Sequence, residues 1–401
     1  MPKPAFLSLT AIASIPLIIT LGNSMLIPIL PVVEKQLGIS PFQSSLIISV
    51  YSIVAAVFIP LAGLLSDRIG RKRVIIPSLA ISGTGGLIAG LAAIFSRSPF
   101  YLILVGRFIQ GLGAAGAFPL VLPLVADVFR KEEDISHGLG VSETANTVGK
   151  VLSPILGTLI ASLVWYLPFF TIPLLASISL LMIAFWIDGS KSKTTTMTLA
   201  NFAANLKDVM KREGKWLTAV FSAGFIIMIV LFGLLVYLSN VLEASYQIFG
   251  IKKGLLLAIP VGTISLASYL SGRFIGKNKA RMRRTSLTGL SFVAGASIAM
   301  IFLRSLWFLL ILMAIGGFGI GISLPSLDAI LTESVENEQR GTITSLYSGM
   351  RYAGVAVGPP AFSLLQQHST NAIFLASGAL SLTAVLLIFF LIRPPQENAC
   401  L

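Results

Sequence analysis

The sequence predicts an all-α polytopic membrane protein with twelve transmembrane helices in two pseudo-symmetric six-helix bundles. Three observations support this prediction: the composition, the number of long apolar runs, and a repeat between the two halves of the chain. Of 401 residues, 55% are hydrophobic and only 11% are charged, whereas a soluble domain carries roughly 25% charged residues. A soluble fold of this size leaves too much surface exposed to hide so many apolar side chains. We therefore expect the bilayer to be the solvent for most of the chain.

Twelve apolar runs are long enough to cross a bilayer, which takes about 20 helical residues. The first run is too long for the apolar core of a signal peptide, so we interpret it as a retained helix. Pro and Gly inside several runs are compatible with membrane helices because neighbouring helices satisfy the freed backbone groups. The predicted spans are residues 5–33, 42–66, 74–95, 99–128, 138–160, 164–187, 216–241, 254–275, 285–303, 306–332, 340–366 and 371–392.

The Lys and Arg residues between these runs predict which side of the membrane each loop faces. With the N-terminus inside, the 29 Lys and Arg residues divide into 21 inside, 5 outside and 3 within spans. Cytoplasmic loops carry such an excess of basic residues. The pattern predicts that both termini are cytoplasmic, and it assigns the net charge of +13 to membrane anchoring rather than to nucleic-acid binding. Compact loops and the absence of sorting signals favour a bacterial cytoplasmic membrane.

A polar stretch after the sixth run divides the chain into four parts. We predict an N-terminal six-helix bundle over residues 1–187, a cytoplasmic linker over 188–215, a C-terminal six-helix bundle over 216–392 and a cytoplasmic tail over 393–401. The second part of the linker, residues 199–215, fits either an amphipathic helix on the inner leaflet or a disordered tether.

The two bundles resemble each other in sequence. In span five Gly149 stands five residues before Pro154, and in span eleven Gly354 stands five residues before Pro359. Spans four and ten both carry several small residues followed by Pro and Asp. Transporters built from such repeats place the substrate site between the two halves near the bilayer midplane.

The loop after span two reads GLLSDRIGRKR, and with it the chain resembles the major facilitator superfamily. A carboxylate in such a loop can cap a neighbouring helix, while the basic residues pair with acids or lipid headgroups. The family signature G-x-L-x-D-R-x-G-R-[RK] is matched at Gly63, Leu65, Asp67, Arg68, Gly70, Arg71 and Lys72.

Three further motifs strengthen this resemblance, which covers essentially the whole chain. Span four matches the family's R-x-x-Q-G motif at Arg107, Gln110 and Gly111. Span one matches L-G-x5-P-x2-P of the twelve-helix drug:proton antiporters at Leu21, Gly22, Pro28 and Pro31. Span five resembles the antiporter motif G-x8-G-x3-G-P-x2-G at Gly140, Gly149, Pro154 and Gly157, with Ser153 in place of one glycine.

The resemblance implies a cytoplasmic gate built from the loop after span two. Asp67 should help to close the cytoplasmic face by docking at the start of span eleven, and Arg71 should pair with Asp127 at the end of span four. The second bundle departs from the pattern because Gly276 stands where the matching loop would carry the aspartate. For Asp328 and Glu333, near the inner end of span ten, we favour a gating role over a deep proton site.

Charged side chains inside membrane spans are costly and indicate function. Glu143, Asn146 and Lys150 lie on one face of span five, because at 100° per residue they fall within about 60° of one another. We favour Glu143 as the protonatable carboxylate. Lys150 either stabilises the ionised form of this carboxylate or contacts an anionic substrate. A structural Glu–Lys pair is the alternative.

Two arginines also lie within spans. The resemblance ties Arg107 to proton coupling, and the alternative is a structural hydrogen-bond donor to backbone carbonyls. Arg351 has three alternative roles: it pairs with Glu143 across the central cavity, it binds substrate, or it lies near the inner surface. The proton-coupling candidates are thus Glu143, Arg107 and Lys150, and the cavity candidates are Asn23, Tyr51, Gln110, Asn146, Lys150, Tyr237, Asn240, Tyr347, Arg351 and Tyr352.

These features predict a proton-coupled secondary transporter that exports amphipathic compounds by rocking its two halves. The alternative is an exporter or flippase of a sugar, glycolipid or other polar metabolite, and the remote alternative is a non-transporting membrane sensor. An enzyme is not expected, because no nucleophile–base constellation and no P-loop are present. Nor do we expect a cofactor, a metal site or a nucleic-acid partner. The expected partners are a small-molecule substrate, protons and membrane lipids, and the chain is expected to act as a monomer.

Overall fold

A computed structural model describes residues 3–129, 131–187, 199–276, 278–302, 305–335 and 337–392. Almost all of these residues are helical, and none of them forms a strand. The predicted cytoplasmic tail and the first part of the predicted linker, residues 188–198, lie outside the described residues.

The first half of the chain forms the elements that correspond to the first six predicted spans. They are α1 (Lys3–Ser24), η1 (Ile27–Ile29), α2 (Leu30–Leu37), α3 (Pro41–Ile69), α4 (Arg71–Phe95), α5 (Pro99–Ala115), η2 (Phe118–Leu120), α6 (Val121–Val128), α7 (Glu132–Leu163) and α8 (Leu167–Trp186).

The second half forms six uninterrupted helices. They are α9 (Leu199–Ala244), α10 (Gly250–Ile275), α11 (Lys279–Ala299), α12 (Leu306–Ser334), α13 (Asn337–His368) and α14 (Thr370–Leu391).

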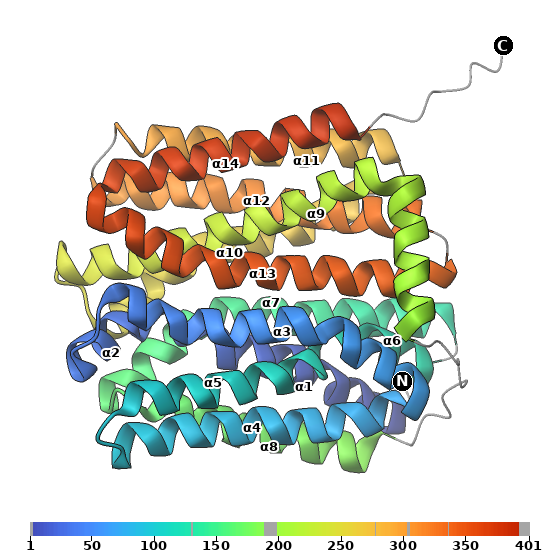
Figure 1. The fold of residues 1–401 in the computed structure, drawn as a ribbon, viewed down its shortest axis with the longest axis horizontal. Coiled ribbons are helices and arrows are strands. Elements are labelled where there is room, and N and C mark those ends of the chain that lie inside the picture. The colour runs from blue at the N-terminus through green and yellow to red at the C-terminus, as the bar shows by residue number, and fades with distance from the viewer. Residues whose placement is uncertain are drawn as a thin grey trace.

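The helices run roughly side by side, with the first half forming one layer and the second half the other (Figure 1). Helix α3 packs against α13, and α7 packs against α10, so these two pairs form most of the contact between the halves. Helix α1 begins and α14 ends at the same end of the bundle (Figure 1). We call this end the N-terminal face, and we call the end where α2 finishes and α10 begins the opposite face.

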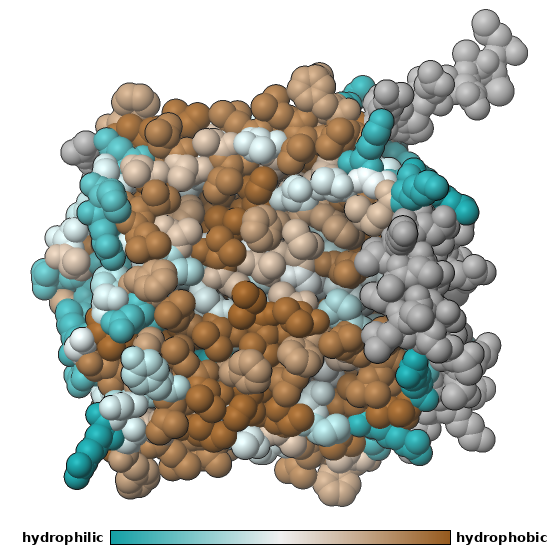
Figure 2. Space-filling model, viewed as in Figure 1, coloured by the Kyte–Doolittle hydropathy of each residue, from teal (hydrophilic) through white to brown (hydrophobic). Residues whose placement is uncertain are grey.

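Ten of the described helical stretches are long and apolar enough to cross a membrane. Helices α11 and α13 are more polar, because α11 starts with the basic sequence KARMRR and α13 with the polar sequence NEQR. Both nevertheless lie parallel to the others in the bundle (Figure 1). The twelve predicted spans therefore all correspond to helices. On the face in view, apolar residues form a belt with hydrophilic residues at its two ends (Figure 2). This distribution is the one that a bilayer requires of a spanning protein.

Two spans of the first half are broken. The first span stops as an α-helix at Ser24 and resumes through η1, and the fourth stops at Ala115 and resumes through η2. Proline explains the first break, because Pro28 and Pro31 lack the N–H groups that would continue the helical hydrogen bonds. Their counterparts in the second half, α9 and α12, are continuous.

Helix α9 joins two predicted segments into one. It begins at Leu199, inside the predicted linker, and continues without a break to Ala244 at the opposite face. Its first part lies across the N-terminal face of the bundle (Figure 1). Of the two alternatives for residues 199–215, a helix or a disordered tether, the backbone forms a helix. The predicted boundary at residue 215 falls within this helix.

The sequence repeat appears in the packing as two equivalent close approaches. A Cβ atom on Gly149 of α7 would lie 3.0 Å from the backbone oxygen of Leu17 on α1. A Cβ atom on Gly354 of α13 would collide with the backbone oxygen of Phe225 on α9. Each glycine thus allows two helix backbones to touch, as small residues do in membrane helix pairs.

Candidate functional site

Arg107 is fully buried in the first half and makes hydrogen bonds only to neutral groups. Its Nε donates to the backbone oxygen of Ile47 at 2.7 Å, and its Nη2 donates to Asn23 Oδ1 at 2.6 Å. Its Nη1 donates to Gln110 Oε1, and the guanidinium lies 4.4 Å from the ring centroid of Tyr51. No carboxylate among the described residues pairs with it. Three cavity candidates therefore surround this buried arginine.

Tyr51 connects the Arg107 cluster to the second half. It is buried on α3, and its side chain is hydrogen-bonded to that of Tyr352 on α13. The two ring centroids are 6.5 Å apart. Two candidates from different halves of the sequence thus meet at the contact between the halves.

The predicted polar stripe on α7 is present. Asn146 Nδ2 donates to Glu143 Oε1 at 3.2 Å, and Thr20 Oγ1 of α1 donates to Asn146 Oδ1 at 2.7 Å. Glu143 is exposed and Asn146 is buried. Lys150 interacts with the charge of Glu143, but among the described residues the two form no direct ion pair. Lys150 is therefore not held in a Glu–Lys pair in this conformation.

Arg351 is paired within its own half. Its Nη1 lies 3.5 Å from Asp328 Oδ1 on the neighbouring helix α12, and its guanidinium lies 5.7 Å from the ring centroid of Tyr347. Lys150 interacts electrostatically with both members of this pair across the contact between the halves. The ion-pair partner of Arg351 is thus Asp328 and not Glu143. The sequence alone did not indicate that Asp328 pairs with Arg351, although Asp328 follows the Pro of span ten as Asp127 follows the Pro of span four.

The remaining candidates pack within the second half. The ring centroid of Tyr237 lies 5.2 Å from that of Phe374, and Asn240 Nδ2 donates to Gln366 Oε1 at 3.3 Å. Tyr347 is buried, and its hydroxyl has no hydrogen-bond partner among the described residues. These side chains serve as helix–helix contacts in this conformation.

At the N-terminal face, Arg71 joins two acidic side chains. Its Nε donates to Asp127 Oδ2 at 2.8 Å, and its Nη2 donates to Asp67 Oδ1 at 3.2 Å. Gly70 has φ 98°, a turn conformation that glycine adopts without strain, and it separates α3 from α4. The predicted pairing of Arg71 with Asp127 is therefore confirmed.

Other residues of the same loop fix the ends of neighbouring helices. Lys72 Nζ donates to the backbone oxygen of Ala184 at 2.9 Å and to that of Ile187, which satisfies the last turn of α8. A Cβ atom on Gly63 would lie 3.5 Å from Ser345 Oγ, so α3 and α13 approach closely here. Arg68 is exposed. The side chains of residues 337–340 at the start of α13 are outside the described set, so the docking of Asp67 there stays a prediction.

The antiporter motif packs α7 against the break in the first span. A Cβ atom on Gly157 would collide with the backbone at Met25, directly at that break. Ser153 fits in place of the pattern's glycine because it is buried and donates to the backbone oxygen of Gly149. The surroundings of Gly140 are open. Pro154 contacts the second half, since its backbone oxygen lies against Gly254 of α10.

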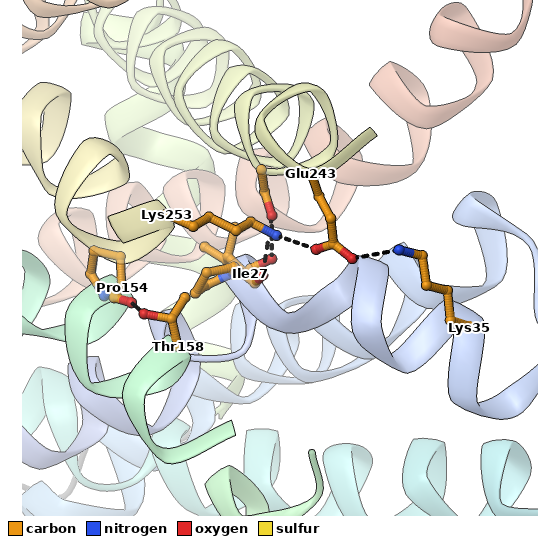
Figure 3. Close-up of polar contacts among 8 residues, drawn as sticks. Ile27, Lys35, Pro154, Thr158, Glu243 and Lys253 are labelled. Carbon is orange, nitrogen blue, oxygen red and sulfur yellow. Dashed lines mark hydrogen bonds and ion pairs between the residues drawn. The ribbon is translucent and has the colours of Figure 1, made fainter. Parts of the chain in front are cut away.

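A buried ionic network at the opposite face was not foreseen from the sequence (Figure 3). Glu243 Oε1 accepts a hydrogen bond from Lys35 Nζ, and its Oε2 accepts one from Lys253 Nζ, each at 2.9 Å. Only 3% of Glu243 and 2% of Lys253 are exposed. From the sequence, both lysines were counted among the five basic residues expected outside the membrane. The overlooked signal is the acid at the end of α9 followed by a base at the start of α10.

Comparison with known proteins places this arrangement in one family. The model of the Major Facilitator Superfamily matches residues 12–305 and 253–400. The bacillibactin exporter of Bacillus subtilis (strain 168) is 46% identical over 392 residues, which cover 98% of this chain and 98% of that protein. The quinolone resistance protein NorA of Staphylococcus aureus (strain Mu50 / ATCC 700699) is 23% identical, and the match covers 92% of this chain and 93% of NorA.

Solved structures share the fold. The crystal structure of the human organic anion transporter MFSD10 (TETRAN) gives a TM-score of 0.76 at 21% identity, and the match covers 97% of this chain and 100% of that one. The D-xylose-proton symporter gives a TM-score of 0.75 at 14% identity, covering 97% and 98%. The fold, the motifs and the whole-length match agree, and the chain is a transporter of the major facilitator superfamily.

Proposed function

We propose that this transporter is a proton-coupled exporter of a small organic compound, and that bacillibactin is the first candidate substrate. The observation that carries the substrate proposal is the 46% identity, over 98% of both chains, to a bacillibactin exporter. Drug-resistance transporters are also similar to this chain, but only at 23–26% identity. Amphipathic drugs are therefore the second class to test.

The polar groups at the contact between the halves support a coupled mechanism. Glu143 is exposed beside Asn146, and Lys150 faces the Arg351–Asp328 pair of the other half. A carboxylate in this position can take up a proton in one conformation and release it in the other, as the two halves rock about the site. Glu143 remains our proposed protonation site.

Lys150 favours an anionic substrate within this proposal. It makes no hydrogen bond or ion pair with any described residue, whereas Arg107 and Arg351 both have partners. An unpaired ammonium group at the contact between the halves can form a charge-assisted hydrogen bond with a substrate anion. This observation keeps open the alternative of an anionic polar metabolite.

The proposed direction of transport follows from the distribution of basic residues. The sequence assigns 21 of the 29 Lys and Arg residues to the side of the membrane that holds the N-terminus, so we place the N-terminal face in the cytoplasm. Export then runs from the N-terminal face to the opposite face. The proposal includes a bacterial cell membrane as the location, lipids as surroundings and a monomer as the active unit.

The test is transport by purified protein in proteoliposomes with an imposed pH gradient. Bacillibactin, a tetracycline and a quinolone are supplied in separate arms, and each flux is compared with and without the gradient. Gradient-driven flux of bacillibactin supports the proposal, flux of the drugs alone supports the multidrug alternative, and flux of none of them rejects both.

Coupling is tested with Glu143→Gln. We expect this variant to lose the dependence of flux on the gradient. Glu133→Gln is the matched control, because Glu133 is exposed near the start of the same helix. Normal coupling in Glu143→Gln would remove that residue from the coupling role. In Lys150→Gln we expect a raised KM for anionic substrates only.

A further inference from the structure

The opposite face is held by an ionic network that joins three helix ends. Lys35 lies in the last turn of α2, Glu243 in the last turn of α9 and Lys253 in the first turn of α10. We call these three residues the Glu243 network (Figure 3). Lys35 belongs to the first half of the chain, and the other two belong to the second. One arm of the network therefore bridges the two halves.

Two charges of this network are placed where their own helices disfavour them. A helix carries partial negative charge at its C-terminus and partial positive charge at its N-terminus. Glu243 lies at a C-terminus and Lys253 at an N-terminus, so neither stabilises its own helix. Contact within the network is what compensates both charges. The two charges therefore stabilise the contact between α9 and α10 and do not stabilise either helix by itself.

The burial of the three side chains predicts how strongly replacement of each would destabilise the network. Glu243 and Lys253 are almost fully buried, so removal of either leaves an uncompensated charge inside the protein. The side chain of Lys35 is 66% exposed, and exposed ion pairs are weak. Glu243 forms ion pairs with both lysines. Its neutralisation therefore breaks the bridge between the halves and also leaves the buried Lys253 without its ion-pair partner.

Residues on both sides of the network also contact the first half. Ser239, one turn before Glu243, has its Oγ 3.4 Å from the backbone oxygen of Ile27 and 3.3 Å from that of Pro28. Gly254, next to Lys253, lies against the backbone of Pro154. The network is thus the centre of a continuous line of contact. That line runs along the broken first span and along α7.

We propose that Glu243 is a gating residue whose bridge between Lys35 and Lys253 holds the opposite face closed. The bridge breaks each time the transporter opens at that face. This inference rests on the rocking of the two halves described under the proposed function. It adds a gate in the second half to the motif loop that lies at the N-terminal face.

Glu34 provides a control of the same chemistry. It lies next to Lys35 on α2 and interacts with the charges of Glu243 and Lys253. Its hydrogen bond, however, comes from Ser44 of α3 in its own half, at 2.5 Å. Glu34→Gln therefore removes a carboxylate from the same region without breaking a hydrogen bond or ion pair between the halves.

The test measures how fast a buried cysteine at this face is labelled. Cys400 is the only cysteine, so Cys400→Ser gives a background without thiols. Thr158→Cys is the reporter, because Thr158 is buried against Gly254 and its hydroxyl bonds only to its own helix. The protein is held in lipid nanodiscs without substrate and treated with a maleimide. Each rate is divided by that of Ser245→Cys, an exposed site beyond the end of α9.

We expect Glu243→Gln to raise the relative labelling rate by about tenfold or more, because it breaks a buried pair. Lys35→Gln should raise it by about two- to fivefold, since that arm is exposed. Glu34→Gln should leave the rate unchanged. Equal rates in Glu243→Gln and the parent, or equal effects of Glu243→Gln and Glu34→Gln, would overturn the proposal.

Lys35→Gln keeps the test decisive if Glu243→Gln does not fold. Lys35 is exposed, so its replacement leaves the core intact, and an unchanged labelling rate in this variant refutes the gate by itself. Because no substrate is present, failure to export bacillibactin would leave the labelling result standing. Export that proceeds normally together with unaltered labelling would reject the gate and keep the proposed function.

Discussion

Replacement of Arg107 by glutamine tests whether this buried arginine holds the first half together. Arg107 connects α5 to α1 and α3 through Asn23, Ile47 and the ring of Tyr51. Glutamine is shorter, carries no charge and has a single NH₂ group, so it cannot reach these groups together. Arg107→Gln should therefore lower the free energy of unfolding.

The size of the loss follows from the contacts. Three interhelical or side-chain hydrogen bonds are lost at about 0.6 kcal/mol each, the average inside membranes. The desolvated cation–π contact adds about 2 kcal/mol. Part of this loss of stability is offset, because the variant no longer buries a charge that no carboxylate neutralises. We expect a net loss of about 2–4 kcal/mol.

The measurement is unfolding in mixed micelles with increasing denaturing detergent, followed by circular dichroism. Arg97→Gln is the matched control, because Arg97 is exposed in the loop before α5. Its effect should stay within about 0.5 kcal/mol, as for other surface substitutions. If Arg107→Gln is as stable as the parent and only transport is lost, Arg107 acts in transport alone and our account of the cluster is wrong.

Two further predictions concern contacts between helices. Gly254→Ala should destabilise the protein because the new Cβ would press on the backbone of Pro154, whereas Gly262→Ala in the open part of α10 should stabilise it by up to about 1 kcal/mol. Thermal unfolding of both variants checks this difference in sign, and two equal shifts would contradict it. Arg71→Gln and Asp127→Asn should be non-additive by about 0.5–1 kcal/mol in a double-mutant cycle, because their side chains form a half-buried ion pair. Additive effects would show that the ion pair contributes nothing.

Much of the fold was predictable because hydropathy reports directly on the bilayer. The span count depended on the length of apolar runs, and these survive the polar starts of α11 and α13. The pairing of Arg71 with Asp127 was also predictable, since the family resemblance implies an acidic partner for Arg71 at the end of span four, where Asp127 stands. The breaks at Ser24 and Ala115 were less visible, because proline and glycine occur inside several helices that stay continuous.

The ionic contacts between helices were not predictable for a physical reason. The helical period places Glu143 and Asn146 on one face, but it says nothing about which helix that face meets. Arg351 therefore had several possible partners, and only packing selects Asp328. The Glu243 network combines residues of α2, α9 and α10, and no single-helix pattern brings such distant residues together.

The two interrupted spans give the molecule an uneven elasticity. A helix that already lacks backbone hydrogen bonds bends there at lower cost than a continuous one. Both interruptions, after Ser24 and after Ala115, lie in the first half, while the equivalent helices α9 and α12 run unbroken. We therefore expect bending at these two interruptions to cost less than bending at the matching turns of α9 and α12. Amide hydrogen exchange should report this difference as faster exchange at the two interruptions than at the matching turns of α9 and α12.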